Sequence, residues 1–564
     1  ALKLNPTFFF YNSDGTYYQK SKDVRNPVAM LNLTNDKTQT DRILANVTGT
    51  LTILKDLKYK MNVALDQTKA TRKVTQDKSL IYLTDNGTAD INNVEAGNFL
   101  IENYLTYNFN LAKKHSFNLL GGHSYQKFRN YYYGMSETGF TVDNIDYLYD
   151  LSYGKNKQVT STSGITVNEL QSFFGRVNYG LLDKYLLTVN FRADGSTKFG
   201  ENNKYGYFPS AALAWRMSEE NFIKKLNVFE NLKLRLSWGI TGNQEIPNKI
   251  SQMLLGSTSG AILNGGSTVV PGITLTRTPN PNLKWEKTEQ VDLGADFSVL
   301  KGRLSGTIDV FSKTTKDVLL EVYSVSPAPT TKVWSNVPNM KIENKGLEIG
   351  LNGVLLANKD FNWTLGGNFS TIKNKVKDLP MSYITTGSPS GPGITGFSSQ
   401  IIKSGYPIGT FWGYNFLGFD ENGKSLYELD ENGNKVEKCI GNAQPDFTFN
   451  FNTSFSWKRF DLSLFFNGVV GNDIYNNLAN VIDQLSLFSK GFNTTVHATT
   501  LPESLDNVLD YSSRYIEDGS YLRLASANLG YTFNMKNSKW ISNLRVYATA
   551  NNLFVLTGYS GYDP

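Results

Sequence analysis

A pair of alternating segments between residues 445 and 476 restricts the possible folds most strongly. In the first segment, large apolar side chains alternate with small polar ones, so Phe447, Phe449, Phe451, Phe455 and Trp457 fall on one face and Thr448, Asn450, Asn452, Ser454 and Ser456 on the other. This period of two residues predicts a β-strand. A turn at Lys458 and Arg459 leads to a second alternating run, in which Leu462, Leu464 and Phe466 share a face.

The dense aromatic face opposite a row of Asn, Thr and Ser favours a strand with lipid on one side and water on the other. A strand of a transmembrane β-barrel has this pattern over about 10 residues. We therefore predict that Phe449 and Phe451 face lipid, and that Asn450 and Asn452 face the lumen.

The composition agrees with an aromatic-rich all-β protein. Aromatic residues make up 13% of the 564 residues and charged residues only 19%, below the usual quarter. A mean hydropathy of −0.33 is compatible with a membrane barrel, because barrel strands carry as many polar as apolar residues. No window approaches 18 consecutive apolar residues, so helical membrane spans are not expected.

Charge, cysteine and histidine content argue against several functions. The net charge of +6 is small for this length, and without a long basic run nucleic acid is not an expected partner. The single Cys439 excludes an intrachain disulfide, and His115, His123 and His497 lie too far apart in sequence to indicate a metal centre. We expect no cofactor and no catalytic site. The first residues lack the features of a signal peptide, so we expect that an N-terminal part is missing.

Alternating segments recur along the chain, joined in turn by short links and long polar segments. Short links on one rim and long loops on the other are typical of outer-membrane barrels. We expect a loop over 1–40, barrel strands within 41–557, and the start of a further extracellular loop at 558–564, with 380–444 and 476–518 among the longest extracellular loops. The strand-like stretch 409–419 then belongs to an extracellular loop or else pairs with a second span.

Counting these segments gives about sixteen membrane strands. On this count the barrel needs one more strand after Pro564 and an odd number before Ala1, because unpaired sheet edges in lipid are prohibitive.

Eight sequence segments, in this order, resemble the SusC/RagA-like TonB-dependent transporters of Bacteroidetes outer membranes. They span residues 192–200, 207–222, 232–244, 280–290, 336–353, 441–455, 514–524 and 551–564. The resemblance implies a barrel of about 22 strands with an N-terminal plug, of which this chain holds most of the barrel but neither the plug nor the first strands.

The resemblance also implies partners and a place in the cell. The expected partners are a SusD-like surface lipoprotein, the TonB-ExbB-ExbD complex acting through a plug and TonB box absent from this chain, and outer-membrane lipid. A dimer of transporter–lipoprotein pairs is also compatible with the family. The expected location is the outer membrane.

Two groups of side chains are candidates for substrate binding. Arg176, Arg192, Arg235 and Arg523 lie on predicted strands; because a charge facing mid-membrane lipid costs about 2–4 kcal/mol, they should face the lumen, where they pair with plug carboxylates or contact substrate. The loop aromatics Trp334, Phe411, Trp412 and Tyr414 could stack on sugar rings, or pack within their loops or against the lipoprotein. In contrast, Trp215, Trp238, Trp363 and Trp457 are expected to mark the membrane interfaces.

A weak calcium candidate occurs in the loop 380–444, which contains the sequence Asp-Glu-Asn-Gly twice. Asp430, Asn432 and Asn434 place side-chain oxygens at alternate positions, but the rest of an EF-hand loop is lacking. The alternative is a hairpin turn, which Asn-Gly strongly indicates.

These observations favour active import of a nutrient, either a glycan (oligosaccharide) or an oligopeptide, together with a SusD-like lipoprotein. A structural or secretion-associated barrel without its own cargo is the alternative.

Overall fold

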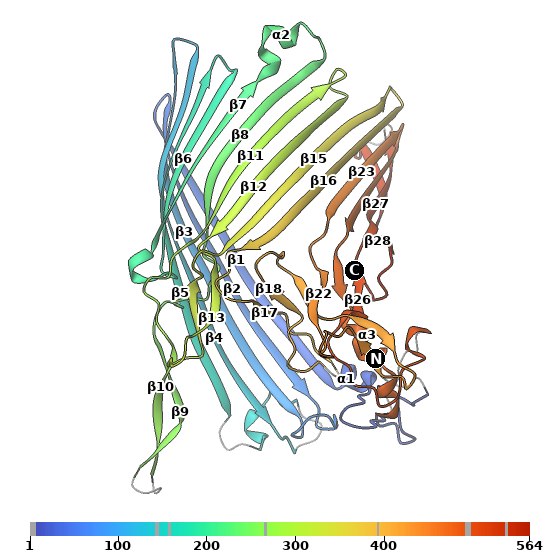
Figure 1. The fold of residues 1–564 in the computed structure, drawn as a ribbon. Coiled ribbons are helices and arrows are strands. Elements are labelled where there is room, and N and C mark those ends of the chain that lie inside the picture. Colours follow the sequence, from blue (N-terminus) through green and yellow to red (C-terminus); the bar gives the residue numbers. More distant parts are fainter. Residues whose placement is uncertain are drawn as a thin grey trace.

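One antiparallel sheet of sixteen strands forms the wall of the molecule (Figure 1). The computed structural model describes residues 7–141, 146–155, 159–263, 268–391, 394–490, 498–535 and 540–564. The strands lie in the order β1-β2-β3-β4-β5-β6-β7-β8-β11-β12-β15-β16-β23-β24-β27-β28, so each pairs with its nearest wall neighbours in sequence. This up-and-down arrangement confirms the predicted all-β barrel fold and the count of sixteen strands.

The wall strands are long, and several extend well beyond the thickness of a membrane. Their bounds are β1 Thr34–Leu54, β2 Leu57–Gln76, β3 Thr88–Leu111, β4 His115–Thr138, β5 Thr160–Leu181, β6 Tyr185–Ser196, β7 Tyr205–Arg216, β8 Phe229–Asn243, β11 Glu286–Val299, β12 Leu304–Lys316, β15 Lys341–Ala357, β16 Phe361–Lys377, β23 Phe447–Trp457, β24 Phe460–Val470, β27 Tyr521–Asn534 and β28 Asn543–Thr557.

The first predicted boundary is wrong. The expected loop over 1–40 contains helix α1 (Pro27–Asn32), and β1 already begins at Thr34. The polar residues before 41 have no apolar alternation, but they continue the pairing with β2, from Thr34 opposite Gln76. A strand that continues beyond the membrane into water does not need an apolar face.

Short turns gather at one rim of the wall, drawn at the top of Figure 1. Several have two successive residues in the left-handed region, such as Leu182 and Asp183 at φ 56° and 55°, and Leu300 and Lys301 at φ 57° and 56°. Two-residue turns with positive φ match the right-handed twist of the strands that they join. The long loops occupy the opposite rim, as predicted.

The two faces of the wall differ in chemistry. Leu236, Leu293, Val310 and Leu347 are register neighbours across four strands, and the first three are 47%, 58% and 53% exposed. The adjacent row on the opposite face carries Arg235 and Asp309, which form an ion pair. An apolar surface this wide on the outside of a barrel is the surface that lipid covers.

The predicted phase of β23 is confirmed by its neighbours. Phe449 lies opposite Phe369 on the apolar face, whereas Asn450 accepts a hydrogen bond from Asn368 Nδ2 at 3.2 Å. The polar face lines the lumen. Asn374, six residues after Asn368 on the same face of β16, accepts a hydrogen bond from the backbone N–H of Ile408, which lies in the loop that folds across the opening.

The loops at the long-loop rim form small sheets of their own. These are β9 Leu254–Leu263 with β10 Thr268–Arg277, β13 Leu319–Tyr323 with β14 Lys332–Asn336, β17 Ile384–Thr386 with β18 Gln400–Ile402, β19 Thr410–Tyr414 and β22 Glu437–Asn442, β20 Phe416–Phe419 with β21 Ser425–Tyr427, and β25 Asp473–Tyr475 with β26 Ile516–Asp518. The stretch 409–419 therefore belongs to a loop and does not enter the wall.

Two segments form most of this layer, and we call them together the loop layer: residues 378–446 and 471–520. In Figure 1 its strands β17, β18 and β22 and helix α3 (Asn477–Ile482) lie together towards the long-loop rim. Its apolar core includes Ile402, which packs with Met340 and Val376 at the ends of β15 and β16. The loop layer is thus anchored on the wall.

The remaining helices of the described residues are α2 (Asn221–Lys224), at the short-turn rim, and the short 3₁₀-helices Leu151–Tyr153, Glu201–Asn203, Met217–Glu219, Leu485–Lys490, Ala498–Thr500 and Ser513–Tyr515. Within the described part of the chain, every helix is too short or too polar to cross a membrane.

Candidate binding site in the barrel lumen

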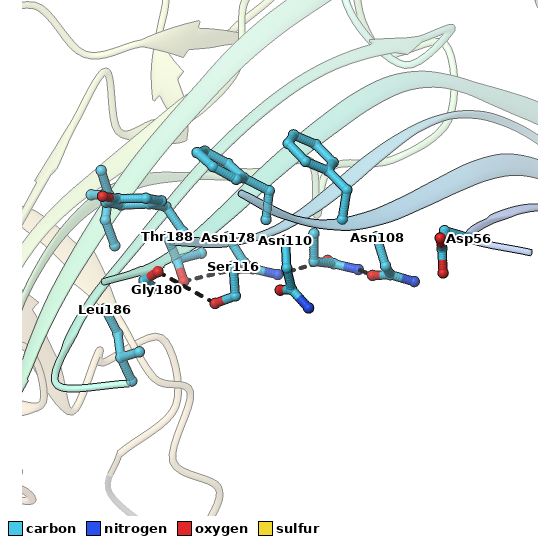
Figure 2. Close-up of a pocket in the computed structure, with 13 residues that line it drawn as sticks. Asp56, Asn108, Asn110, Ser116, Asn178, Gly180, Leu186 and Thr188 are labelled. Carbon is cyan, nitrogen blue, oxygen red and sulfur yellow. Dashed lines mark hydrogen bonds between the residues drawn. The ribbon is translucent and has the colours of Figure 1, made fainter. Parts of the chain in front are cut away.

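A row of polar side chains crosses four neighbouring strands near the short-turn rim (Figure 2). Thr188 Oγ1 donates to Asn178 Oδ1 at 2.9 Å, Asn178 Nδ2 donates to Asn118 Oδ1 at 2.9 Å, and Asn118 Nδ2 donates to Asn108 Oδ1 at 2.5 Å. We call these four residues the amide row. They border a recess of about 550 Å³ that Asn110 and Ser116 also line. Apart from the Asp56 carboxylate, the polar groups of the recess are neutral donors and acceptors, which suit hydroxyl or amide groups.

A charged network lies further along the lumen face. Arg235 on β8 donates from Nε to Asp296 Oδ1 at 2.9 Å and from Nη2 to Asp309 Oδ1 at 2.8 Å. Lys233 Nζ lies 3.2 Å from Asp296 Oδ2. The network joins β8, β11 and β12. Its carboxylates lie on the lumen face, because a charged group on the lipid face would destabilise the barrel.

Arg192 and Arg176 border a second recess, of about 590 Å³, together with Glu102, Tyr104 and Phe174. Arg192 Nε contacts Asp194 Oδ1 at 2.7 Å, and its Nη2 donates to Ser172 Oγ at 2.8 Å. Arg176 Nε donates to Asn190 Oδ1 at 2.6 Å. Among the described residues Arg176 has no carboxylate within ion-pair distance, so its guanidinium retains free donors for a bound molecule.

The fourth predicted arginine lies at the long-loop end of β27. Arg523 forms an ion pair with Asp563. This chain therefore supplies carboxylates of its own to Arg192, Arg235 and Arg523, whereas plug carboxylates or substrate were expected as their partners. The reason is register: Asp296 and Asp309 lie one and two strands away from Arg235, which a single strand pattern does not show.

The predicted loop aromatics pack within their loops and do not offer free faces. Phe411 is only 5% exposed, Trp412 contacts Tyr406 edge-on at 5.7 Å, and Lys403 Nζ lies 4.2 Å from the centre of the Trp412 ring. Tyr414 packs against Tyr427 at 5.8 Å. Of the roles considered for them, stacking on sugar rings and packing within their loops or against the lipoprotein, these contacts correspond to packing within the loops.

Trp334 does not belong to the same group. It lies on β14 and packs against a buried cluster around Leu283 and Trp285. The four aromatics therefore do not form one binding surface.

The Asp430 segment is a hairpin turn. Asp430 Oδ1 accepts from the backbone N–H groups of Asn432 and Asn434 at 2.9 and 2.8 Å, and these hydrogen bonds lower the pKa of the Asp430 carboxyl. Asp420 accepts in the same way from Asn422 and Lys424. The turn alone accounts for the alternating oxygens.

The histidines lie apart on the wall. His115 Nδ1 is 2.8 Å from the Tyr179 hydroxyl, and His123 Nε2 is 3.1 Å from Gln171 Nε2. His497 lies outside the described residues. Over the described ranges, no group of three or more His, Cys, Asp or Glu side chains is arranged to hold a metal ion.

The amide row was not among the site residues predicted from the sequence. Its signal is present in the sequence, since Asn108, Asn118, Asn178 and Thr188 all sit at polar positions of alternating segments. The pairing register then brings Asn108 opposite Asn118, Asn118 opposite Asn178, and Asn178 opposite Thr188.

Comparison with known proteins identifies the fold and the family. Residues 2–553 match the family model described as TonB dependent receptor-like, beta-barrel. The chain is 33% identical to TonB-dependent receptor P3 of Formosa agariphila and 31% identical to TonB-dependent receptor SusC of Bacteroides thetaiotaomicron. Both alignments include all of this chain, and they cover 58% of P3 and 57% of SusC. The chain therefore spans somewhat more than half of the length of these relatives.

Solved structures give the same result for the fold. The structure of the RagAB peptide transporter matches with a TM-score of 0.81 at 24% identity, covering 96% of this chain and 61% of that chain. The open-open state of the RagAB peptide importer matches with a TM-score of 0.85 at 23% identity, covering all of this chain and 63% of that chain. With its lipid-facing outer surface and polar lumen, this chain belongs to the TonB-dependent receptor-like β-barrel family of the outer membrane, with sequence similarity to SusC and a fold like that of the RagAB transporter.

Proposed function

We propose that this barrel imports a nutrient across the outer membrane by TonB-dependent active transport, together with a SusD-like surface lipoprotein. The cargo is a glycan or an oligopeptide. Membership of the receptor family supports transport, and similarity to SusC and RagA-type barrels supports this kind of cargo.

The lumen chemistry is the observation that carries the proposal. The amide row and the Arg176 recess present neutral and cationic hydrogen-bond donors on one continuous face of the wall. A polar chain with many hydroxyl or amide groups can exchange its water for these groups along its path. An apolar cargo would gain nothing from them.

The loop layer supports the proposed lipoprotein partner. It has its own buried residues, including Ala479, Leu509 and Tyr515, and it lies at the rim where a surface protein would approach. A loop with a packed core presents a fixed surface, and a fixed surface costs less entropy to bind than a flexible one.

Arg176 is the residue that best tests cargo binding. Arg176→Ala removes a guanidinium that donates a hydrogen bond to the neutral Asn190, so the wall should remain stable while uptake of the cargo decreases. Arg235→Ala is the matched control, because it removes a guanidinium that holds two carboxylates of the wall. Both variants are made in the complete transporter and measured for nutrient uptake and for barrel folding.

Measuring both nutrient uptake and barrel folding separates an effect on cargo binding from an effect on stability. Reduced uptake by Arg176→Ala with normal folding supports the proposal. Deletion of the gene should also abolish growth on one glycan or peptide source, and rescue should require an intact TonB box. Normal growth on every nutrient, combined with a defect in secretion or envelope assembly, would instead indicate a structural or secretion-associated barrel.

A further inference from the structure

A band of lysines faces outward at the long-loop ends of β12, β15 and β16. It consists of Lys316, Lys341, Lys345, Lys373, Lys375 and Lys377, and we call it the lysine band. Its outward orientation follows from the phase of the strands. Asn344 and Asn374 form a hydrogen bond on the lumen face at 2.7 Å, so the odd-numbered residues of β15 and β16 point to the outside. On β12 the even-numbered residues do so, because Val310 lies opposite the outward Leu347.

The lysine band begins where the apolar surface ends. Along β16 the outward positions run from Phe361 and Trp363 through Leu365 and Phe369 to Thr371, and then become lysine. This apolar stretch is as long as the ~9–11 residues that a strand needs to cross the hydrocarbon layer. The lysines therefore lie at the level of the lipid headgroups, on the side of the membrane where the long loops are.

Acidic side chains neutralise only part of the band. Lys316 pairs with Glu289 at 2.9 Å, Lys377 with Glu343 at 2.8 Å, and Lys341 with Asp378 at 3.4 Å. The other three, Lys345, Lys373 and Lys375, are exposed, and in the described part of the chain they have no carboxylate within ion-pair distance.

Two of these unpaired lysines are direct register neighbours, since Lys345 lies opposite Lys373. Like charges directly across a strand pair destabilise a sheet. An external anion placed between the two ammonium groups would turn this repulsion into attraction. The surface around Lys345 and Lys373 therefore favours a bound anion over water alone.

We infer that the lysine band binds the phosphate groups of an outer-leaflet glycolipid, with Lys345, Lys373 and Lys375 as its main ligands. Charge complementarity and depth select this occupant. A phosphate at the headgroup level reaches the ammonium groups while the acyl chains of the same molecule cover Leu365 and Phe369. Binding of this kind fixes a lipid beside the loop layer.

The test uses the complete transporter, purified in detergent and mixed with lipid A in its phosphorylated or dephosphorylated form. Bound lipid is measured by mass spectrometry of the intact complex. Near an anionic surface each lysine contributes roughly a fivefold gain in affinity, so the triple variant Lys345→Gln, Lys373→Gln, Lys375→Gln should bind phosphorylated lipid A about 100-fold more weakly.

A matched variant controls for net charge. Lys55→Gln, Lys301→Gln and Lys359→Gln remove the same charge from exposed turns at the opposite rim, and this variant should bind phosphorylated lipid A like the parent. Heat-dependent gel mobility verifies that both variants form folded barrels.

Several results would overturn the inference. They are unchanged binding by the lysine-band variant, equal loss in the matched variant, equal binding of dephosphorylated lipid A, and full displacement of the lipid by millimolar inorganic phosphate. The last result would indicate a site for free anions. Recovery of an acidic protein in place of lipid would indicate a protein-docking surface.

Discussion

Arg514 and Glu503 form a two-pronged ion pair in the interior of the loop layer. Arg514 Nη1 donates to Glu503 Oε1 at 3.1 Å and Nη2 donates to Oε2 at 3.0 Å, and the two side chains are only 6% and 0% exposed. Glu503 also accepts from Asn507 Nδ2 and from the backbone N–H of Leu485. One carboxylate thus connects three parts of the segment 471–520.

Replacing Glu503 with Gln should loosen this segment. The substitution leaves Arg514 charged and buried without its carboxylate, and breaking a buried pair from one side costs about 3–5 kcal/mol. We expect faster amide hydrogen exchange in 483–490 and 498–515, while exchange in β23 and β24 stays unchanged.

The exposed pair of Lys424 and Asp506 provides the control for Glu503→Gln. The two side chains are 41% and 78% exposed, and a pair of this kind is worth about 0–1 kcal/mol. Asp506→Asn should therefore leave exchange in the loop layer nearly unchanged. Equal effects of the two substitutions would contradict a specific role for the buried pair.

The same carboxylate should make the loop layer sensitive to acid. Burial alone raises the pKa of the Glu503 carboxyl, but the hydrogen bonds from Arg514, Asn507 and Leu485 outweigh it and hold the pKa below the ordinary value of a glutamate. A lowered pKa in the folded state stabilises the fold above the unfolded pKa, and this stability is lost as the pH falls through the folded pKa.

We therefore expect the amide protection of 483–490 and 498–515 to be constant near neutral pH and to fall below about pH 4.5. Hydrogen exchange corrected for its intrinsic pH dependence measures this. The Glu503→Gln variant should lack this acid step, because its side chain does not titrate. An identical acid step in the variant would assign the effect to another group.

Arg235 should contribute to the stability of the wall more than Arg176 does. Arg235→Leu leaves Asp296 and Asp309 facing each other across β11 and β12 without their shared cation, whereas Arg176→Leu leaves only the neutral Asn190. Because the lumen is wet, we expect the Arg235 substitution to cost about 1 kcal/mol. Urea-dependent unfolding in detergent measures the difference, and a greater loss for Arg176→Leu would contradict it.

The strands, and the separation of short turns and long loops onto opposite rims, were predictable because each depends on local sequence. Alternation places Phe449 and Asn450 on opposite faces, and link lengths separate the rims. In contrast, pairs such as Arg235 with Asp309 depend on the register of strands far apart in sequence. The cover over Phe411 and Trp412 depends on loop packing, for which the sequence has no periodic signal.

The phase of β23 gives the most direct test of the barrel. Phe451 and Asn452 are neighbours near the middle of the strand, and Phe451 stacks on Phe466 with ring centres 4.4 Å apart. Phe451→Arg should destabilise the barrel by about 2–4 kcal/mol, because it places a charge in mid-membrane lipid. Asn452→Arg places the same charge in the polar lumen and should cost much less.

Reversible folding into lipid vesicles, followed against urea concentration, compares the two variants of β23. Phe451→Leu is the control for the lost ring contact with Phe466, which accounts for about 0.5–1.5 kcal/mol. The further decrease in the free energy of unfolding from Phe451→Leu to Phe451→Arg then measures the effect of the charge. If Asn452→Arg were the more damaging of the two arginine variants, the lipid and lumen faces of β23 would be reversed.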